Sequence, residues 1–325
     1  MSYRNRGAMT NGSNSVSKPK LTVEEQVEHL RRKGVTFDLC SAEQARETLS
    51  DKTYYFKLAT YRVLFEKRVG GVHDSEYVGL DFGHLRDLAA IDHILRYTLL
   101  PMTLDIGRFA KVRLMREVTE RADEDGYSIV ADYLESLSER NRSIREKEME
   151  RLKRDGYSGG MARKYDEEKP VWVLIELLSF GGFINFYLFC ADRWKDRRMR
   201  SERYLLRQAQ AVRNACAHST NIINGFASGE TSTIRTPREV ALALNEMGIN
   251  RRARRAKMAN PRIQQITMMA FSYREMVAGF HTREMCRGLV GALKHRAVEH
   301  ADWYTNTDCV VSAYRFLAKV FDNWV

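Results

Sequence analysis

The chain has 325 residues, 44% of them hydrophobic, which is enough for a large core in one or two domains. Its net charge of +11 includes 38 arginines and 15 lysines, and this arginine excess favours a polyanionic partner such as RNA over a codon bias. The five cysteines are scattered without a CxxC pair, which excludes a disulfide framework or zinc finger and fits a reducing cytoplasm. The first residues also lack the charged-then-apolar order of a signal peptide.

The N-terminal part of the chain predicts a tail followed by a small helical unit. Residues 1–17 are polar and rich in Gly, Ser and Asn, which is typical of disorder. In residues 18–70, the capping-box pattern occurs at Thr22–Glu25 and again at Ser41–Gln44, and it predicts two helix starts. Gly34 lies where the first of these helices should stop, and a third apolar segment follows the second.

The region 75–232 is expected to contain the helical core. From Phe82, leucines and isoleucines recur three and four residues apart, which predicts a long helix that Pro101 is expected to kink. A charged insertion is expected around 120–165. Within it, residues 138–155 carry charge on all sides, which predicts an exposed helical protrusion.

The segment VWVLIELLSFGGFINFYLFCA (171–191) could be mistaken for a membrane span. It contains Glu176, Asn185 and the Gly181–Gly182 pair, and a carboxylate inside a span costs about 2.5–3.5 kcal/mol on insertion scales. We therefore expect a buried core helix that begins at Pro170 and is broken near the glycines, and no membrane partner.

The stretch VRNACAHS carries Arg213, Asn214 and His218 on a helix that should end near residue 219. The Arg–x4–His spacing alone carries no information, because it also occurs at Arg68–His73 across a glycine loop. Asn214 and His218, however, are four residues apart and share a helix face, which the long arginine side chain can reach. Histidine exchanges protons near neutral pH and arginine neutralises charge on a phosphorane, so this set could cleave RNA without metal through the substrate 2′-OH. The alternative is a partly buried histidine that the helix dipole favours.

Two basic segments flank this stretch. Residues 193–213 and 235–262 each hold eight basic and two acidic residues, and one-signed clusters of this kind favour a phosphate backbone over a solvated helix face. The candidate RNA-binding residues are Arg197, Arg198, Arg200, Arg203, Arg207, Arg251, Arg252, Arg254, Arg255 and Lys257. The surrounding region 233–325 predicts a basic helical extension, which ends in an apolar stripe from Val310 to Trp324.

Other chemistries find no support in the sequence. It has no HExxH pair, no phosphate-binding glycine loop and no GxSxG elbow, so we expect neither a metal nor a cofactor. No alternating strand pattern occurs either, and the fold class is expected to be all-α.

The chain resembles the Abi-like family of abortive-infection proteins (AbiD/AbiF type) within the HEPN ribonuclease superfamily. Three blocks carry the resemblance in family order: KPKLTVEEQVEHLRRKGVTF through YYFKLATYRVLFEK, PVWVLIELLSFGGF, and VRNACAHSTNIIN. Together they cover most of residues 18–224. The resemblance implies a HEPN-type helical bundle that acts as a ribonuclease in the bacterial cytoplasm, in phage defence or as a toxin.

The resemblance also implies roles for particular residues. Arg213 and His218 match the catalytic pair, Asn214 the polar residue between them, and Glu176 a residue that braces the site. One motif per chain implies a homodimer with a composite site, whose products carry 2′,3′-cyclic phosphate and 5′-OH ends. A structured non-coding RNA is a plausible regulator. Thr220 stands where toxins silenced by nucleotidyltransferase antitoxins carry a tyrosine.

Two other classes of function remain open. The chain could be a catalytically silent RNA-binding protein that forms a ribonucleoprotein with a structured non-coding RNA, in which case its basic surface would be the functional part. It could also be a DNA-binding regulator that uses the small N-terminal helical unit. Growth arrest that requires His218 would favour the nuclease, whereas copurified RNA would favour the binding protein.

Overall fold

A computed structural model describes residues 19–304 and 308–325, and the tail expected at 1–17 lies outside these ranges. Within the described residues the chain has fifteen α-helices and no β-strand, so the all-α prediction is confirmed. The helices are α1 (Val23–Arg31), α2 (Ala42–Glu47), α3 (Tyr55–Ala59), α4 (Phe82–Glu120), α5 (Ser128–Ser136), α6 (Glu139–Leu152), α7 (Gly159–Lys164), α8 (Val171–Leu177), α9 (Phe180–Arg193), α10 (Arg197–Ala217), α11 (Arg238–Glu246), α12 (Arg251–Ala259), α13 (Pro261–Met276), α14 (Phe280–Val298) and α15 (Asp308–Trp324). Short π or 3₁₀ segments lie at Thr48–Lys52, Thr60–Leu64, Ile223–Ala227 and Ala301–Tyr304.

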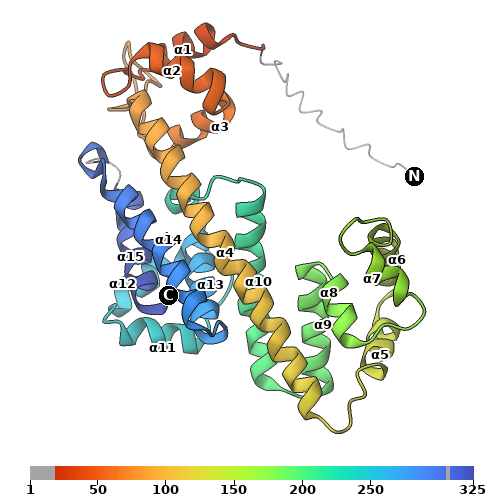
Figure 1. Cartoon of the computed structure of the whole chain (residues 1–325). Coiled ribbons are helices and arrows are strands. Elements are labelled where there is room, and N and C mark those ends of the chain that lie inside the picture. Colours follow the sequence, from red (N-terminus) through yellow and green to blue (C-terminus); the bar gives the residue numbers. More distant parts are fainter. Residues whose placement is uncertain (1–18, 305–307) are drawn as a thin grey trace, which may run out of the picture.

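The N-terminal unit forms one end of the molecule (Figure 1). Both predicted capping boxes are present: Thr22 and Glu25 bond reciprocally at the start of α1, and Ser41 and Gln44 do so at the start of α2. The predicted third helix is split between α3 and the 3₁₀ segment that follows it.

Gly34 follows the end of α1 with a left-handed φ of 78°, as expected of a helix stop. A Cβ at this position would lie 2.9 Å from the Cβ of Glu76. We expect Gly34→Ala to lower the free energy of unfolding by about 1–2 kcal/mol, because an L-residue is strained in this region. Urea denaturation checks this, with Gly156→Ala as the control, since nothing lies within 4 Å of Gly156 and its φ is not left-handed. Equal effects of the two substitutions would contradict the argument.

The 39-residue helix α4 is the spine of the molecule and runs from the N-terminal unit to the opposite end (Figure 1). It begins at Phe82 as predicted and continues without interruption through Pro101. Most of its apolar side chains are buried, and the helix packs against α10, α13 and α14. The charged protrusion is also confirmed: α6 exposes most of its residues, and Arg145 is the residue of this helix that is buried.

The apolar segment 171–191 forms two helices, α8 and α9, as expected of a broken core helix. The break falls at Leu178 and Ser179, one residue before the glycine pair, and Pro170 is the N-cap of α8 rather than its first residue. Most side chains of both helices are buried in the protein. Among the described residues no helix is long and apolar enough to cross a membrane.

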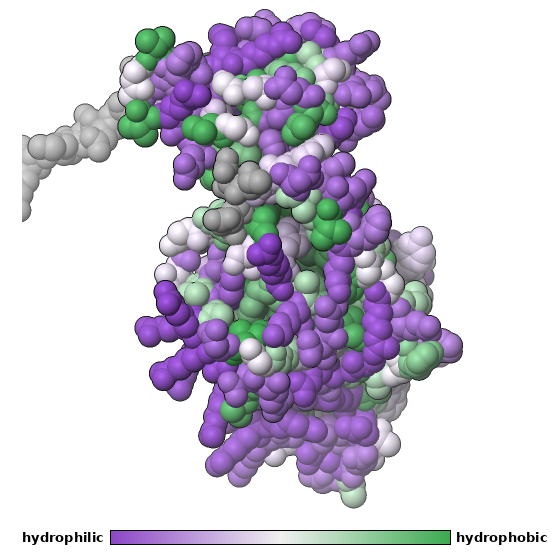
Figure 2. Space-filling view, turned by 90° about the vertical axis from the view of Figure 1, so that its left-hand side faces the viewer, coloured by the Kyte–Doolittle hydropathy of each residue, from purple (hydrophilic) through white to green (hydrophobic). Residues whose placement is uncertain are grey.

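The C-terminal helices pack directly on the spine. α13 lies against both α10 and α4, and α14 lies against α4. The predicted stripe of α15 faces the core, where Val310, Leu317, Phe321 and Trp324 are buried. Figure 2 shows the side that carries α14 and α15, where hydrophilic residues dominate and some hydrophobic residues reach the surface below the N-terminal unit.

Candidate active site

Arg213 is held at the seam between α9 and α10. Its guanidinium carbon lies 5.3 Å from the centre of the Phe180 ring, in a cation–π contact. Phe180 begins α9 and packs over Gly107 of α4, where a Cβ would lie 3.4 Å from the ring. The half-buried arginine is thereby positioned by two other helices. Phe180 was not among the predicted site residues, because its apolar neighbours in the sequence are typical of an ordinary core segment.

Asn214 and His218 are exposed on the same face at the C-terminal end of α10. His218 is the C-cap residue, and its backbone N–H donates to the Asn214 carbonyl at 3.0 Å. Among the described residues, no hydrogen bond joins the side chains of Arg213, Asn214 and His218 to one another or to any other group. Their polar atoms are therefore available to a substrate.

The chain turns sharply after His218, and this turn fixes the end of α10. Ser219 has a left-handed φ of 53°, and the Thr220 N–H donates to the Ala215 carbonyl at 2.8 Å, as in a Schellman motif. The side chain of Asn221 then reaches the N-terminal unit, where it donates to Thr60 and accepts from the Tyr61 hydroxyl at 3.2 Å.

A buried carboxylate anchors the segment that follows. Asp92 of α4 is fully buried and accepts from the backbone N–H groups of Ile222 and Ile223 at 3.0 and 3.1 Å. It also accepts from the Tyr61 hydroxyl at 2.8 Å and from Arg96 one turn along α4. Burial raises the pKa of Tyr61, so this hydroxyl remains protonated and continues to donate. The site therefore sits on a rigid base that joins α4, α10 and the N-terminal unit. In the sequence, the opposite charges of Asp92 and Arg96, four residues apart on the apolar face of α4, could have indicated this network.

Cysteine chemistry does not suit this site. Cys216 lies between Arg213 and His218 in the sequence, but its side chain is buried, and burial raises the pKa of the thiol to about 12. It is therefore protonated at neutral pH and unable to act as a nucleophile. The groups with suitable chemistry are the imidazole, the guanidinium and the amide.

Glu176 lies on α8 near this seam. Its carboxylate is about half exposed and pairs with Lys111 of α4 at 3.3 Å. Lys111 lies one turn beyond Gly107, the residue that Phe180 covers. Glu176 is thus placed beside the helices that position Arg213, and its bracing role remains a prediction.

The candidate RNA-binding arginines of α10 differ in whether their charge is already paired with a carboxylate of this chain. Arg198 pairs with Glu117 at 2.7 Å and Arg200 pairs with Asp192 at 2.5 Å, which compensates their charges. Within the described residues, the hydrogen-bond partners of Arg207 are neutral amides, those of Asn185 and Gln210. The remaining candidates of this helix are Arg197, which is exposed, and Arg203, which is half-buried.

α12 carries a cluster of arginines whose positive charge is not paired with a carboxylate in the described part of the chain. Arg251, Arg252 and Arg255 are exposed and make no hydrogen bond or ion pair within the described part of the chain. Arg254 donates to Asn245 and to the Ile249 carbonyl, and Lys257 donates to Ser312 at 2.6 Å. Three of these five residues are therefore free to meet a polyanion.

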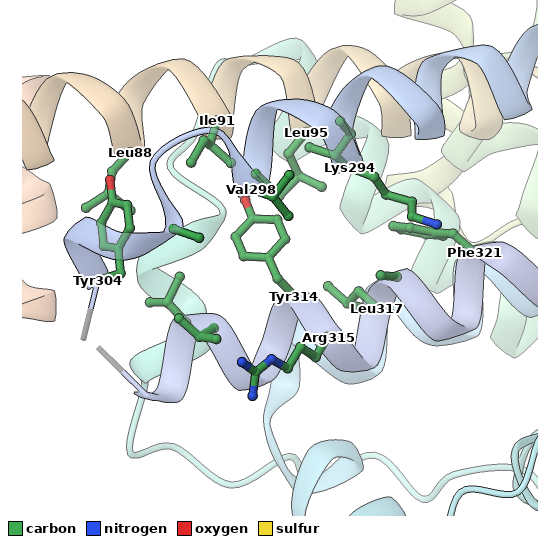
Figure 3. A pocket seen from close by; sticks show the side chains of 16 residues that line it. Leu88, Ile91, Leu95, Lys294, Val298, Tyr304, Tyr314, Arg315, Leu317 and Phe321 are labelled. Carbon is green, nitrogen blue, oxygen red and sulfur yellow. The ribbon is translucent and has the colours of Figure 1, made fainter. Parts of the chain in front are cut away.

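The second Arg–x4–His spacing leads to no comparable site. Arg68 and His73 lie in an exposed loop, where the His73 ring contacts Glu76 at 3.0 Å. An apolar cavity of about 520 Å³ lies elsewhere, between α4, α14 and α15, with Tyr314 projecting from α15 toward α4 (Figure 3). Its lining is mostly apolar and contains no histidine, and it shares no residue with the exposed end of α10.

Comparison with known proteins gives one match. A family model described as Abi-like protein matches residues 47–224, more than half of the chain, and this range includes α3 to α10 and the exposed end of α10. No curated protein and no solved structure matches the chain.

Proposed function

We propose that this chain, which belongs to the Abi-like protein family, is a metal-independent RNA endonuclease of the HEPN type. It would act in bacterial phage defence or as the toxin of a toxin–antitoxin system. The active form would be a homodimer in which the exposed ends of two α10 helices face one another.

The single observation that carries the proposal is the state of the three polar side chains. Asn214 and His218 are exposed, Arg213 is held by Phe180, and the hydrogen-bonding groups of all three are unoccupied within the described residues. Such groups, on a helix end whose following segment is anchored by Asp92, are free to bind a ligand from outside the chain. A second copy provides the additional acid or base that one chain lacks.

The proposed reaction is an internal transesterification of RNA. One neutral His218 takes the proton of the 2′-OH, whose oxygen forms a bond to the adjacent phosphorus. The bond from phosphorus to the 5′-oxygen breaks, and the protonated His218 of the second copy donates a proton to that oxygen. Arg213 neutralises the charge that develops on the phosphorane, and Asn214 orients the phosphate. The products are a 2′,3′-cyclic phosphate and a 5′-OH end.

We expect the purified protein to cleave total RNA in EDTA, because no step requires a metal ion. The new 5′ ends should accept label from polynucleotide kinase without prior phosphatase treatment, since they carry a hydroxyl group. Dependence on added magnesium, or 5′-phosphate ends, would contradict the proposal.

The free arginines of α12 favour a second candidate, a catalytically silent RNA-binding protein that forms a ribonucleoprotein with a structured non-coding RNA. In that case the native protein would copurify with a discrete small RNA. Release of this RNA would yield no cleavage by either the wild type or His218→Ala.

A further inference from the structure

A groove of about 560 Å³ lies beside the seam that holds Arg213. Its walls come from α5, α6 and α9, and Arg207 of α10 also lines it, beside Asn185 of α9. The groove and the candidate active site share the first turn of α9: Phe180 faces Arg213, whereas Gly181 and Gly182 face the groove.

Two polar side chains of the groove wall, Tyr133 and Arg145, are buried beside one another. Tyr133 is 2% exposed and its hydroxyl lies beside the Arg145 guanidinium, and Arg145 is 9% exposed with an unpaired Nε. The Arg145 guanidinium also lies against α9, where a Cβ on Gly182 would be 2.7 Å from Nη1. Unpaired buried polar atoms of this kind are costly unless a ligand or water satisfies them.

The charges in the groove divide it into two parts. Arg145 is compensated by Glu148, and the carboxylate at the outer end, Asp192, is compensated by Arg200. Among the residues that the structure describes, Arg207 is hydrogen-bonded to amides and to no carboxylate, so its positive charge is uncompensated beside the first two turns of α9. The unpaired N–H groups of a helix N-terminus add to this positive field. A phosphate would thus bind at the Arg207 end, and a neutral group would bind in the remainder.

The neutral part has apolar walls with amide edges. Ile144 is 46% exposed on the mostly charged helix α6, and Phe189 of α9 lines the same groove, packed against Tyr133 with ring centres 5.4 Å apart. Asn141 and Asn185 line the same space. An apolar slot with amide groups at its edge matches a nucleobase, which stacks on flat side chains and hydrogen-bonds through its edge.

We propose that this groove binds one unpaired nucleotide of an RNA strand, next to the phosphate that is cut. The inference rests on the proposed function, since it identifies a substrate subsite of the same nuclease. Arg207, Gln210 and Asn214 lie three and four residues apart on α10, so one helix face leads from the groove to the catalytic end over about 10 Å. A strand that follows this face would place its phosphate at Arg207 and its base between Ile144 and Phe189.

The test measures binding in a protein that carries His218→Ala, so that no cleavage occurs. The probe is a ten-nucleotide, unstructured RNA with a fluorescent label, and affinity is read by fluorescence anisotropy. Ile144→Ala with Asn141→Ala should weaken binding about tenfold, because base stacking and edge contacts are lost. Both residues are exposed, so the fold should tolerate their replacement. Leu242→Ala on α11, an equally exposed apolar residue outside the groove, is the matched control and should bind like its parent.

Unchanged affinity in the double variant would overturn the subsite, and so would an equal loss in the Leu242→Ala control. Neither result would affect the nuclease proposal, which is tested separately by cleavage with the wild-type protein. Conversely, the double variant could lose tenfold in RNA affinity while the wild-type protein cuts no RNA. That result would support the groove as an RNA-binding site and reject the nuclease proposal.

Discussion

His218→Ala is expected to lower the rate of RNA cleavage by about 10²–10⁴-fold, the usual contribution of one general acid–base group. Arg213→Ala should lower it by about 10²–10³-fold, because the charge that develops on the phosphorane is no longer neutralised. His218 is exposed and has no side-chain partner within the described residues, so its replacement should leave the unfolding midpoint unchanged. Initial rates on a defined RNA, measured at equal protein concentration, check both values.

The chain provides a matched control for this experiment. His73 stands five residues after Arg68, in the same spacing as the candidate pair, but it lies in an exposed loop beside Glu76. His73→Ala should cleave RNA at the wild-type rate. If the two histidine variants lose the same activity, or if neither loses any, the assignment of the site to the end of α10 is wrong.

Mixed dimers separate a composite site from two independent ones. When a tagged wild-type subunit is coexpressed with His218→Ala, a composite site predicts that the heterodimer loses most of its activity. Two independent sites predict about half of the wild-type rate, because the wild-type subunit would still cleave RNA on its own.

Asp92→Ala is expected to lower the free energy of unfolding by about 3–5 kcal/mol, the usual result of breaking a buried ion pair from one side. The substitution leaves the buried Arg96 without its partner and the N–H groups of Ile222 and Ile223 without an acceptor. Equilibrium urea unfolding measures the loss. Because the segment after His218 is held by this carboxylate, RNA cleavage should fall as well, even at temperatures where the protein remains folded.

An exposed ion pair serves as the control for Asp92. Glu47 pairs with Lys52 at 2.7 Å on the surface, and Glu47→Ala should leave the unfolding midpoint unchanged, because water screens such pairs. A similar loss in both variants would show that the Asp92 network has no special role in stability.

Local sequence patterns were sufficient for several of the helix boundaries. Both capping boxes, the stop at Gly34 and the start of α4 at Phe82 were predicted correctly, because each depends on interactions among residues close together in the chain. A kink was expected at Pro101, but α4 continues through this residue without interruption. Tertiary packing along a buried spine can maintain a helix that local propensity disfavours.

The candidate site likewise combines residues that local sequence patterns indicate with contacts that only the tertiary packing creates. Residues 213–218 could be chosen from the sequence because Asn214 and His218 are a helical turn apart and share a face, and that relation depends only on the geometry of one helix. The contacts that organise the site could not be chosen in this way. Phe180 meets Arg213, and Asp92 meets Ile222, across long separations in the sequence, which only the packing of α4, α9 and α10 brings together. The groove lined by Arg145 and Arg207 arises for the same reason, since its walls come from helices that share no local pattern.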